Sequence, residues 1–210
     1  MKKIFYSLFF YLISAFGISL TIVANVGVSS FNSFNVAVSS LTSIKVGTVT
    51  TIVNLIFLVA CIFLDKNRKI KNYLFILISL LMFGNVVNFF VYSLLGSLTL
   101  SSYLSRILLF ILGTIIAGIG TGKVLYFEIL KFPIENFCLI LSQKTSISFQ
   151  SYRYSIDVAC VCFSLLFSVF FSLPIFVREG TAISLILLSS TISFSKNHLN
   201  FENYFTKHQK

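Results

Sequence analysis

The chain has 210 residues, of which 57% are hydrophobic and 10% charged, and its mean hydropathy is +0.95. Soluble domains carry about 25% charged residues because their surfaces face water, so this composition excludes an ordinary soluble domain. The net charge of +10 comes from basic residues at the ends of apolar segments, and not from a basic face. That distribution is typical of membrane proteins and argues against nucleic-acid binding.

Six apolar segments follow one another along the chain, and a helix needs roughly 20 apolar residues to cross a bilayer. The segments are approximately Ile4 to Val23, Gly47 to Leu64, Tyr73 to Leu95, Ile107 to Tyr126, Tyr152 to Val177 and Thr181 to Phe194. The last is short and is expected to be tilted or re-entrant, because about 14 residues reach only ~21 Å. The sequence therefore predicts an all-α, polytopic membrane helix bundle with about six transmembrane helices.

The basic residues also predict how the bundle is oriented. The first segment is longer than a signal-peptide core and no A-x-A site follows it, so we expect it to be retained. If the N-terminus is cytoplasmic, three basic residues lie outside: Lys45, Arg106 and Arg178. Thirteen then lie inside: Lys2, Lys3, Lys66, Arg68, Lys69, Lys71, Lys123, Lys131, Lys144, Arg153, Lys196, Lys207 and Lys210. This excess predicts a bacterial cytoplasmic-membrane protein with both termini in the cytoplasm and a polar tail over residues 196–210.

The two halves of the chain resemble each other when one is shifted by 103 residues. The shift pairs Gly17 with Gly120, Asn32 with Glu135, Phe34 with Phe137, Thr42 with Thr145 and Asn54 with Asp157. Each half holds three apolar segments and a short amphipathic stretch after the first of them. Because three crossings reverse the direction of entry, we predict two inverted membrane repeats, residues 1–98 and 99–195.

The amphipathic stretches are too short to cross a membrane, although their apolar residues recur at helical spacing. These residues are Phe31, Phe34, Val38 and Leu41 in the first stretch, and Ile134, Phe137 and Leu141 in the second. Pro133 suits the first turn of a helix, where an N–H group is not needed. Two interpretations remain open. The stretches are either re-entrant half-helices that line a cavity, or interfacial helices that lie flat on opposite membrane surfaces.

Several motifs resemble the YczE/YyaS/YitT group of small multi-pass bacterial membrane proteins. In the first half they are Gly17, the run from Asn25 to Asn32, and Lys45-Val-Gly47-Thr48. In the second half they are Gly113, Gly118 and Gly120, Phe132-Pro133-Ile134-Glu135, and Glu179-Gly180-Thr181. The resemblance covers roughly residues 10 to 195 and implies a multi-pass bacterial inner-membrane protein.

Asp157 is the strongest candidate for a functional residue, because a carboxylate inside a bilayer is costly. Arg153 lies four residues earlier on the same helix face, so the two are predicted to pair. Such a pair either neutralises itself near the cytoplasmic interface or couples a cation or proton to transport. The predicted substrate or ion pathway comprises Asp157, Arg153, Glu135, Asn32 and Asn54. Residues predicted to serve helix packing or half-helix turns are Gly27, Gly118, Gly120, Pro133 and Gly180.

No catalytic motif occurs in the chain: it lacks H-E-x-x-H, G-x-S-x-G and a phosphate loop, so we expect no enzyme. The four cysteines form no C-x-x-C pair, and no metal or cofactor is expected. The leading hypothesis is a permease-like transporter of a small solute, in which two repeats rock around a central site. The alternative is a non-transporting accessory, a scaffold or a subunit of a membrane-protein partner. In both hypotheses the surroundings are the lipid bilayer.

Overall fold

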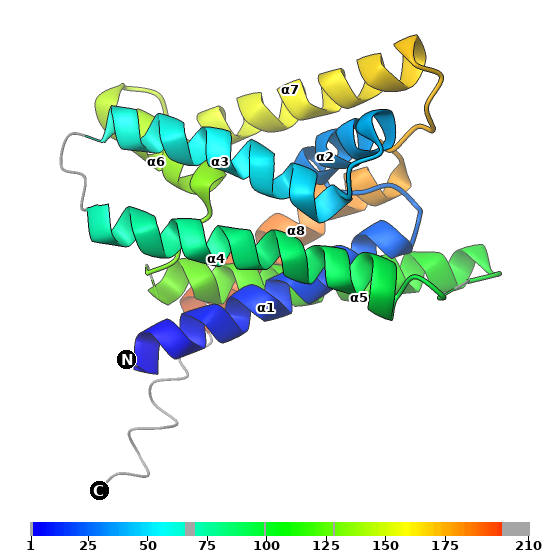
Figure 1. Ribbon diagram of the computed structural model, residues 1–210, viewed down its shortest axis with the longest axis horizontal. Coiled ribbons are helices and arrows are strands. Elements are labelled where there is room, and N and C mark those ends of the chain that lie inside the picture. The colour runs from blue at the N-terminus through cyan, green and yellow to red at the C-terminus, as the bar shows by residue number, and fades with distance from the viewer. Residues whose placement is uncertain (1, 66–69, 99, 128, 199–210) are drawn as a thin grey trace, which may run out of the picture.

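The computed structural model describes residues 2–65, 70–98, 100–127 and 129–198, and these residues form a bundle of helices without strands (Figure 1). The elements are α1 (Lys2–Val23), α2 (Ser30–Thr42), α3 (Val46–Leu64), α4 (Ile70–Asn88), the π-helical η1 (Phe89–Leu94), α5 (Tyr103–Phe127), α6 (Pro133–Lys144), α7 (Phe149–Phe170) and α8 (Glu179–His198). The predicted all-α class is confirmed. Residues 66–69 of the basic loop and residues 199–210 of the predicted tail lie outside the described residues.

Five helical segments among the described residues are long and apolar enough to cross a membrane: α1, α3, α4 with η1, α5 and α7. Large apolar side chains cover their outer surfaces. Phe63 of α3 is 80% exposed and Val169 of α7 is 76% exposed. Surfaces of this kind are rare on soluble monomers and suit contact with lipid. The helices therefore indicate a membrane protein.

Two helices differ from the predicted segments at their ends. The fifth apolar segment was expected to be helical as far as Val177, but α7 ends at Phe170. Pro174 lies in the continuation, and proline removes a backbone N–H and restricts the residue before it. The last segment is longer than expected, because α8 extends over 20 residues from Glu179 to His198.

Small residues allow α1, α5 and α8 to pack closely. A Cβ atom added at Gly120 of α5 would meet the backbone of Ser14 in α1, and one added at Gly113 would meet Leu20. The two contacts run in opposite senses along the chain, so α1 and α5 are antiparallel. On its other side α5 packs against α8. There a Cβ at Gly118 would clash with Thr191.

The direction of the remaining helices follows from similar contacts. Gly122 of α5 faces Ser195 of α8, one turn beyond the contact of Gly118 with Thr191, so these two helices are parallel. At the start of α3, the Gly47 N–H donates to Asn88 Oδ1 near the end of α4, over 2.8 Å. Helices α3 and α4 are therefore antiparallel neighbours.

The short helices α2 and α6 both pack against α3 and α7, inside the bundle (Figure 1). Phe57, near the middle of α3, contacts Phe31 of α2 and Phe137 of α6, with ring centroids 6.5 and 5.4 Å apart. Phe132, just before α6, stacks on Tyr11 midway along α1 at 4.7 Å. Each short helix thus begins at depth in the bundle, and other helices enclose it.

Candidate functional site

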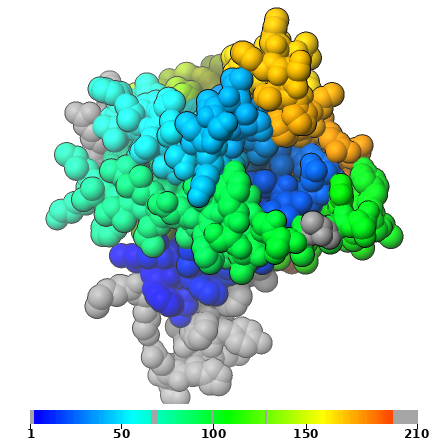
Figure 2. Space-filling model, turned by 45° about the vertical axis from the view of Figure 1, so that its right-hand side comes forward, coloured from blue at the N-terminus to red at the C-terminus, as the bar shows by residue number. Residues whose placement is uncertain are grey.

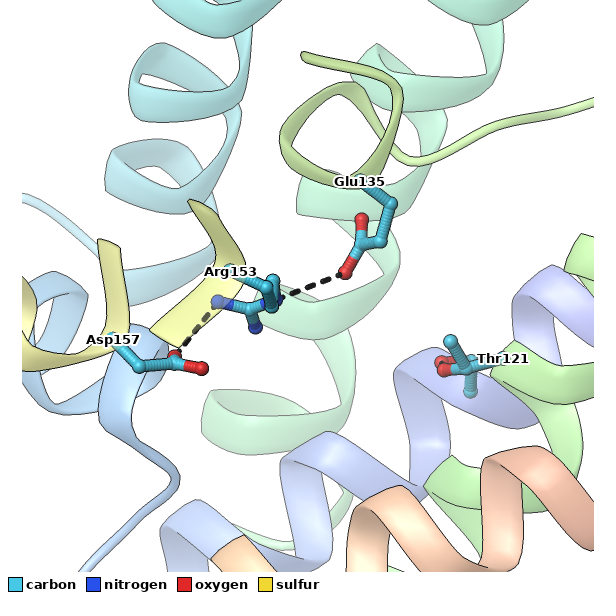
Figure 3. Close-up of polar contacts among 5 residues, drawn as sticks. Thr121, Glu135, Arg153 and Asp157 are labelled. Atoms are coloured by element: carbon cyan, nitrogen blue, oxygen red, sulfur yellow. Dashed lines mark hydrogen bonds and ion pairs between the residues drawn. The ribbon is translucent and has the colours of Figure 1, made fainter. Parts of the chain in front are cut away.

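Three charged residues meet where α6 packs against α7, and we call them the charged cluster: Glu135, Arg153 and Asp157. Arg153 Nη1 lies 2.7 Å from Asp157 Oδ1, and Arg153 Nε lies 3.8 Å from Glu135 Oε1. Figure 3 shows the guanidinium between the two carboxylates. The side chains are largely buried, with exposed fractions of 25% for Arg153, 20% for Glu135 and 16% for Asp157. The predicted pairing of Arg153 with Asp157 is confirmed.

Helix starts determine the positions of these side chains. Ser148 caps α7, because its Oγ accepts the Ser151 N–H over 3.2 Å, and Arg153 and Asp157 then lie one turn apart on one face. Pro133 occupies the first turn of α6, so Glu135 also lies in that turn. A carboxylate is favoured there by the positive end of the helix dipole.

The two carboxylates have different surroundings. Asp157 accepts a short hydrogen bond from Arg153, whereas the 3.8 Å distance leaves Glu135 beyond hydrogen-bond range of the same guanidinium. Glu135 Oε2 is buried and has no hydrogen-bond partner. Burial raises the pKa of Glu135 above its usual 4.5; Arg153 and a hydrogen bond from the Glu135 backbone N–H oppose that shift, and Asp157 adds to it. The site therefore holds one hydrogen-bonded ion pair, Arg153–Asp157, and one carboxyl group whose pKa lies above its usual range.

A second set of polar residues occupies the positions that the predicted repeat pairs with the charged cluster. This neutral cluster consists of Asn32, Thr50 and Asn54, with Asn32 only 7% and Asn54 only 4% exposed. The Asn54 side-chain amide donates to the Thr50 carbonyl over 2.9 Å, and the Thr50 hydroxyl donates to the Val46 carbonyl over 2.9 Å. The positions that hold the Arg153–Asp157 ion pair on α7 thus hold, on α3, two side chains that donate hydrogen bonds to the backbone of their own helix.

Some buried amide atoms on α2 and α3 lack hydrogen-bond partners. Both polar side-chain atoms of Asn35 are buried and unpaired, and so is Asn54 Oδ1. Asn35 lies one turn after Phe31, which contacts Phe57, and Asn54 lies three residues before Phe57. The end of α2 and the start of α3 are close together. Asn35 lies nearer to that end of α2 than Phe31 does, and Asn54 lies nearer to that start of α3 than Phe57 does. The region offers unsatisfied donors and acceptors to a polar solute or water.

The comparisons with known proteins agree with the resemblance found in the sequence. The family of unknown function DUF6198 matches residues 1–197. The chain belongs to this family. It is also 26% identical over 159 residues to uncharacterized protein YyaS of Bacillus subtilis (strain 168), a match that covers 74% of this chain and 77% of YyaS. No solved structure matches the chain.

A cavity of about 460 Å³ opens at the end of this DUF6198 bundle where α1 ends and α8 begins. Figure 2 shows the blue segment that contains the end of α1 recessed between the blue-to-cyan α2–α3 region and the orange and green segments. The cavity is lined by Ile22, Asn25, Gly27, Val28, Val36, Pro174, Ile175, Phe176 and Arg178. One cationic side chain in a mainly apolar wall is a common composition for a small-molecule site.

Two of the glycines predicted to form turns lie beside this cavity. Gly27 has a φ of +99°, and a Cβ there would lie 3.0 Å from the backbone of Arg178. The N–H of Gly180 donates to the Val26 carbonyl over 2.8 Å. These contacts hold the segments before α2 and before α8 together.

The structure brings three of the five predicted pathway residues into direct contact, namely those of the charged cluster. Asn32 and Asn54 lie in the neutral cluster on the other pair of helices. Two features of this region were not predicted from the sequence. Phe57 carries no signal among 25 phenylalanines, and Pro174, Ile175 and Phe176 in the cavity wall were assigned to a helix.

Proposed function

We propose that this protein is a permease-like carrier that moves a small solute across the bacterial cytoplasmic membrane without altering it chemically. The observation that carries the proposal is the pair of short helices, α2 and α6, that begin at depth and are enclosed by longer helices. Irregular backbone within a membrane is tolerated where protein or a water-filled cavity surrounds it, and carriers build solute sites from such helices.

The proposed architecture is two inverted repeats with six crossings, α8 being the sixth. In support, α2 starts at Ser30 and α6 at Pro133, while α3 starts at Val46 and α7 at Phe149, a separation of 103 residues in both pairs. The packing is also exchanged: α2 lies against α7, and α6 against α3. The last turns match too, because the Thr42 hydroxyl donates to the carbonyl of Val38 and the Thr145 hydroxyl to that of Leu141.

The proposed orientation places both termini in the cytoplasm. It is supported by the excess of basic residues on that side, and by the antiparallel and parallel directions of the neighbouring helices. The charged cluster then lies toward the cytoplasm and the Arg178 cavity toward the outside. Phe57 separates the two regions, between Phe31 and Phe137. Rocking of the repeats would open one region while closing the other.

A binding screen followed by a flux assay tests this proposal. The purified protein would be unfolded thermally with amino acids, organic acids, sugars, nucleosides and inorganic ions in turn. A ligand at a hundred times its dissociation constant stabilises by about 2.7 kcal/mol. We expect at least one solute to raise the unfolding temperature and to enter liposomes that contain the protein. Stabilising solutes that are never transported, or a flat screen with folded protein, would contradict a carrier.

An accessory role is the second candidate, and the surface of α7 favours it. The main packing partners of α7 among the described residues are α2 and α6, and much of its surface remains exposed. Val158 is 60% exposed and Phe170 is 76% exposed. Lipid would cover such a face in a carrier, whereas a partner subunit would cover it in an assembly. Crosslinking from Val158→Cys in cells to one partner of defined mass would support the accessory role.

A further inference from the structure

The charged cluster contains more negative than positive charge. When all three groups are ionised, Glu135 and Asp157 contribute two negative charges and Arg153 one positive charge. Among the described residues, the other titratable groups that interact with the cluster are the Tyr11 hydroxyl of α1 and the thiols of Cys138 and Cys160, while Cys61 of α3 interacts with Cys138. None of these four groups is a cation. One buried negative charge therefore needs a further partner.

The geometry identifies Glu135 as the carboxylate that is less closely paired with Arg153. Arg153 is engaged by Asp157 at 2.7 Å, and its 3.8 Å separation from Glu135 is too long for a hydrogen bond. Glu135 Oε2 is buried and has no hydrogen-bond partner. A neutral acid costs far less than an ionised carboxylate in such surroundings.

We propose that the charged cluster binds one exchangeable proton, carried by Glu135 as a neutral carboxylic acid, and that this proton is the coupling ion of the carrier. Coupling rests on the proposed function, whereas proton binding does not. Burial, which raises the pKa of Glu135, agrees with the assignment.

Release and uptake follow from the position of Arg153. Closer approach of its guanidinium to Glu135 stabilises the carboxylate. The O–H bond of Glu135 then breaks, its electron pair stays on the oxygen, and the proton passes to water. When Arg153 returns to Asp157, Glu135 takes a proton from water again. A movement of about one ångström, from 3.8 Å to hydrogen-bond distance, is therefore enough to change the charge of the site.

The neutral cluster shows that this helix arrangement does not require charge. Asn32 and Asn54 occupy the corresponding positions on α2 and α3, where both are buried. Glu135→Gln and Asp157→Asn reproduce those amides in the charged half. Both variants are therefore expected to fold.

Infrared spectroscopy of the full chain in a sugar-based detergent, which has no ester carbonyl, tests the proposal. We expect a carboxylic-acid C=O band that persists at a pH where exposed carboxyl groups are ionised. Glu135→Gln should remove the band. Asp157→Asn should move its midpoint to lower pH, because Arg153 becomes free to pair with Glu135. Glu179→Gln changes an exposed carboxylate beside Arg178 and should leave the band unaltered.

A second measurement needs no substitution at the site. The acidic residues of the chain are four Glu and two Asp, so ¹³C-labelled glutamate should shift the band and ¹³C-labelled aspartate should not. The proposal is overturned if the band is absent from the wild type at that pH, survives Glu135→Gln, or shifts with labelled aspartate. No solute is needed, so a failed flux assay would count against the carrier and leave the proton site to be judged separately.

Discussion

The charged cluster on α6 and α7 and the neutral cluster on α2 and α3 have the same placement on their helices but different chemistry. Arg153 bridges two carboxylates in one, whereas Thr50 accepts a hydrogen bond from Asn54 in the other. The neutral cluster stabilises its helix through local bonds alone. The charged cluster needs a cation, and its third member, Glu135, remains without a hydrogen bond from that cation.

This difference separates what the fold requires from what the charges add. A scaffold of short helices enclosed by long ones forms in both places, so its packing does not depend on ionised groups. Buried charges in the second half cost free energy and respond to pH, as the amides of the first half do not. The comparison therefore assigns the responsive role to the charged half.

The largest expected effect comes from Arg153→Gln, which leaves the buried Asp157 carboxylate without its cation. We expect the free energy of unfolding to fall by about 3–5 kcal/mol at neutral pH. The loss should shrink in acid, where the carboxylates become protonated. Thr50→Val at the paired position removes one hydrogen bond and should cost about 1 kcal/mol. Denaturant unfolding followed by tyrosine fluorescence measures both, and equal losses would contradict the difference between the clusters.

The next prediction tests whether the same substitution has the same effect on stability at two positions that the repeat pairs. Gly17 and Gly120 are paired by the 103-residue shift, and a Cβ at either would press on the backbone of the facing helix. Gly17→Val and Gly120→Val should each lower the free energy of unfolding by about 1–3 kcal/mol or more. Ile186→Val, on an exposed position, should stay within about 0.5 kcal/mol. A loss confined to one glycine would break the equivalence.

A smaller effect concerns pH and Glu135. Burial raises the pKa of Glu135 above 4.5. At pH values between the unfolded and the folded pKa, the folded protein therefore holds a proton that the unfolded chain has released. The free energy of unfolding should therefore fall as pH rises from the unfolded to the folded pKa, by about 1.4 kcal/mol for each unit between them. Glu135→Gln should reduce this slope. Parallel pH profiles for the two proteins would refute the assignment.

The smallest effect is expected at Asn35, where neither side-chain polar atom has a partner. Asn35→Leu removes an unsatisfied buried amide and should leave stability unchanged or raise it by up to about 1 kcal/mol. Thermal unfolding without added solute measures the change. A clear loss of stability would mean that water or another group satisfies Asn35 in the folded protein.

The sequence predicted the helical class, the short helices and the pairing of Arg153 with Asp157, because helical periodicity and an i,i+4 spacing are local properties. It did not predict that Glu135 would come close to that pair without bonding to it, since the approach depends on how α6 packs against α7. The end of α7 was also placed too late. Apolar composition continues to Val177, and the effect of Pro174 on the preceding turn was not weighed.

The opposite orientation of the two halves is the central claim, and labelling single cysteines from one side of the membrane tests it most directly. Ser43 and Ser146 are paired by the repeat and exposed just beyond the ends of α2 and α6. In a variant without Cys61, Cys138, Cys160 and Cys162, a membrane-impermeant maleimide should label Ser43→Cys in intact cells. It should label Ser146→Cys only after the membrane is opened. Labelling of both positions from the same side would contradict the inverted arrangement.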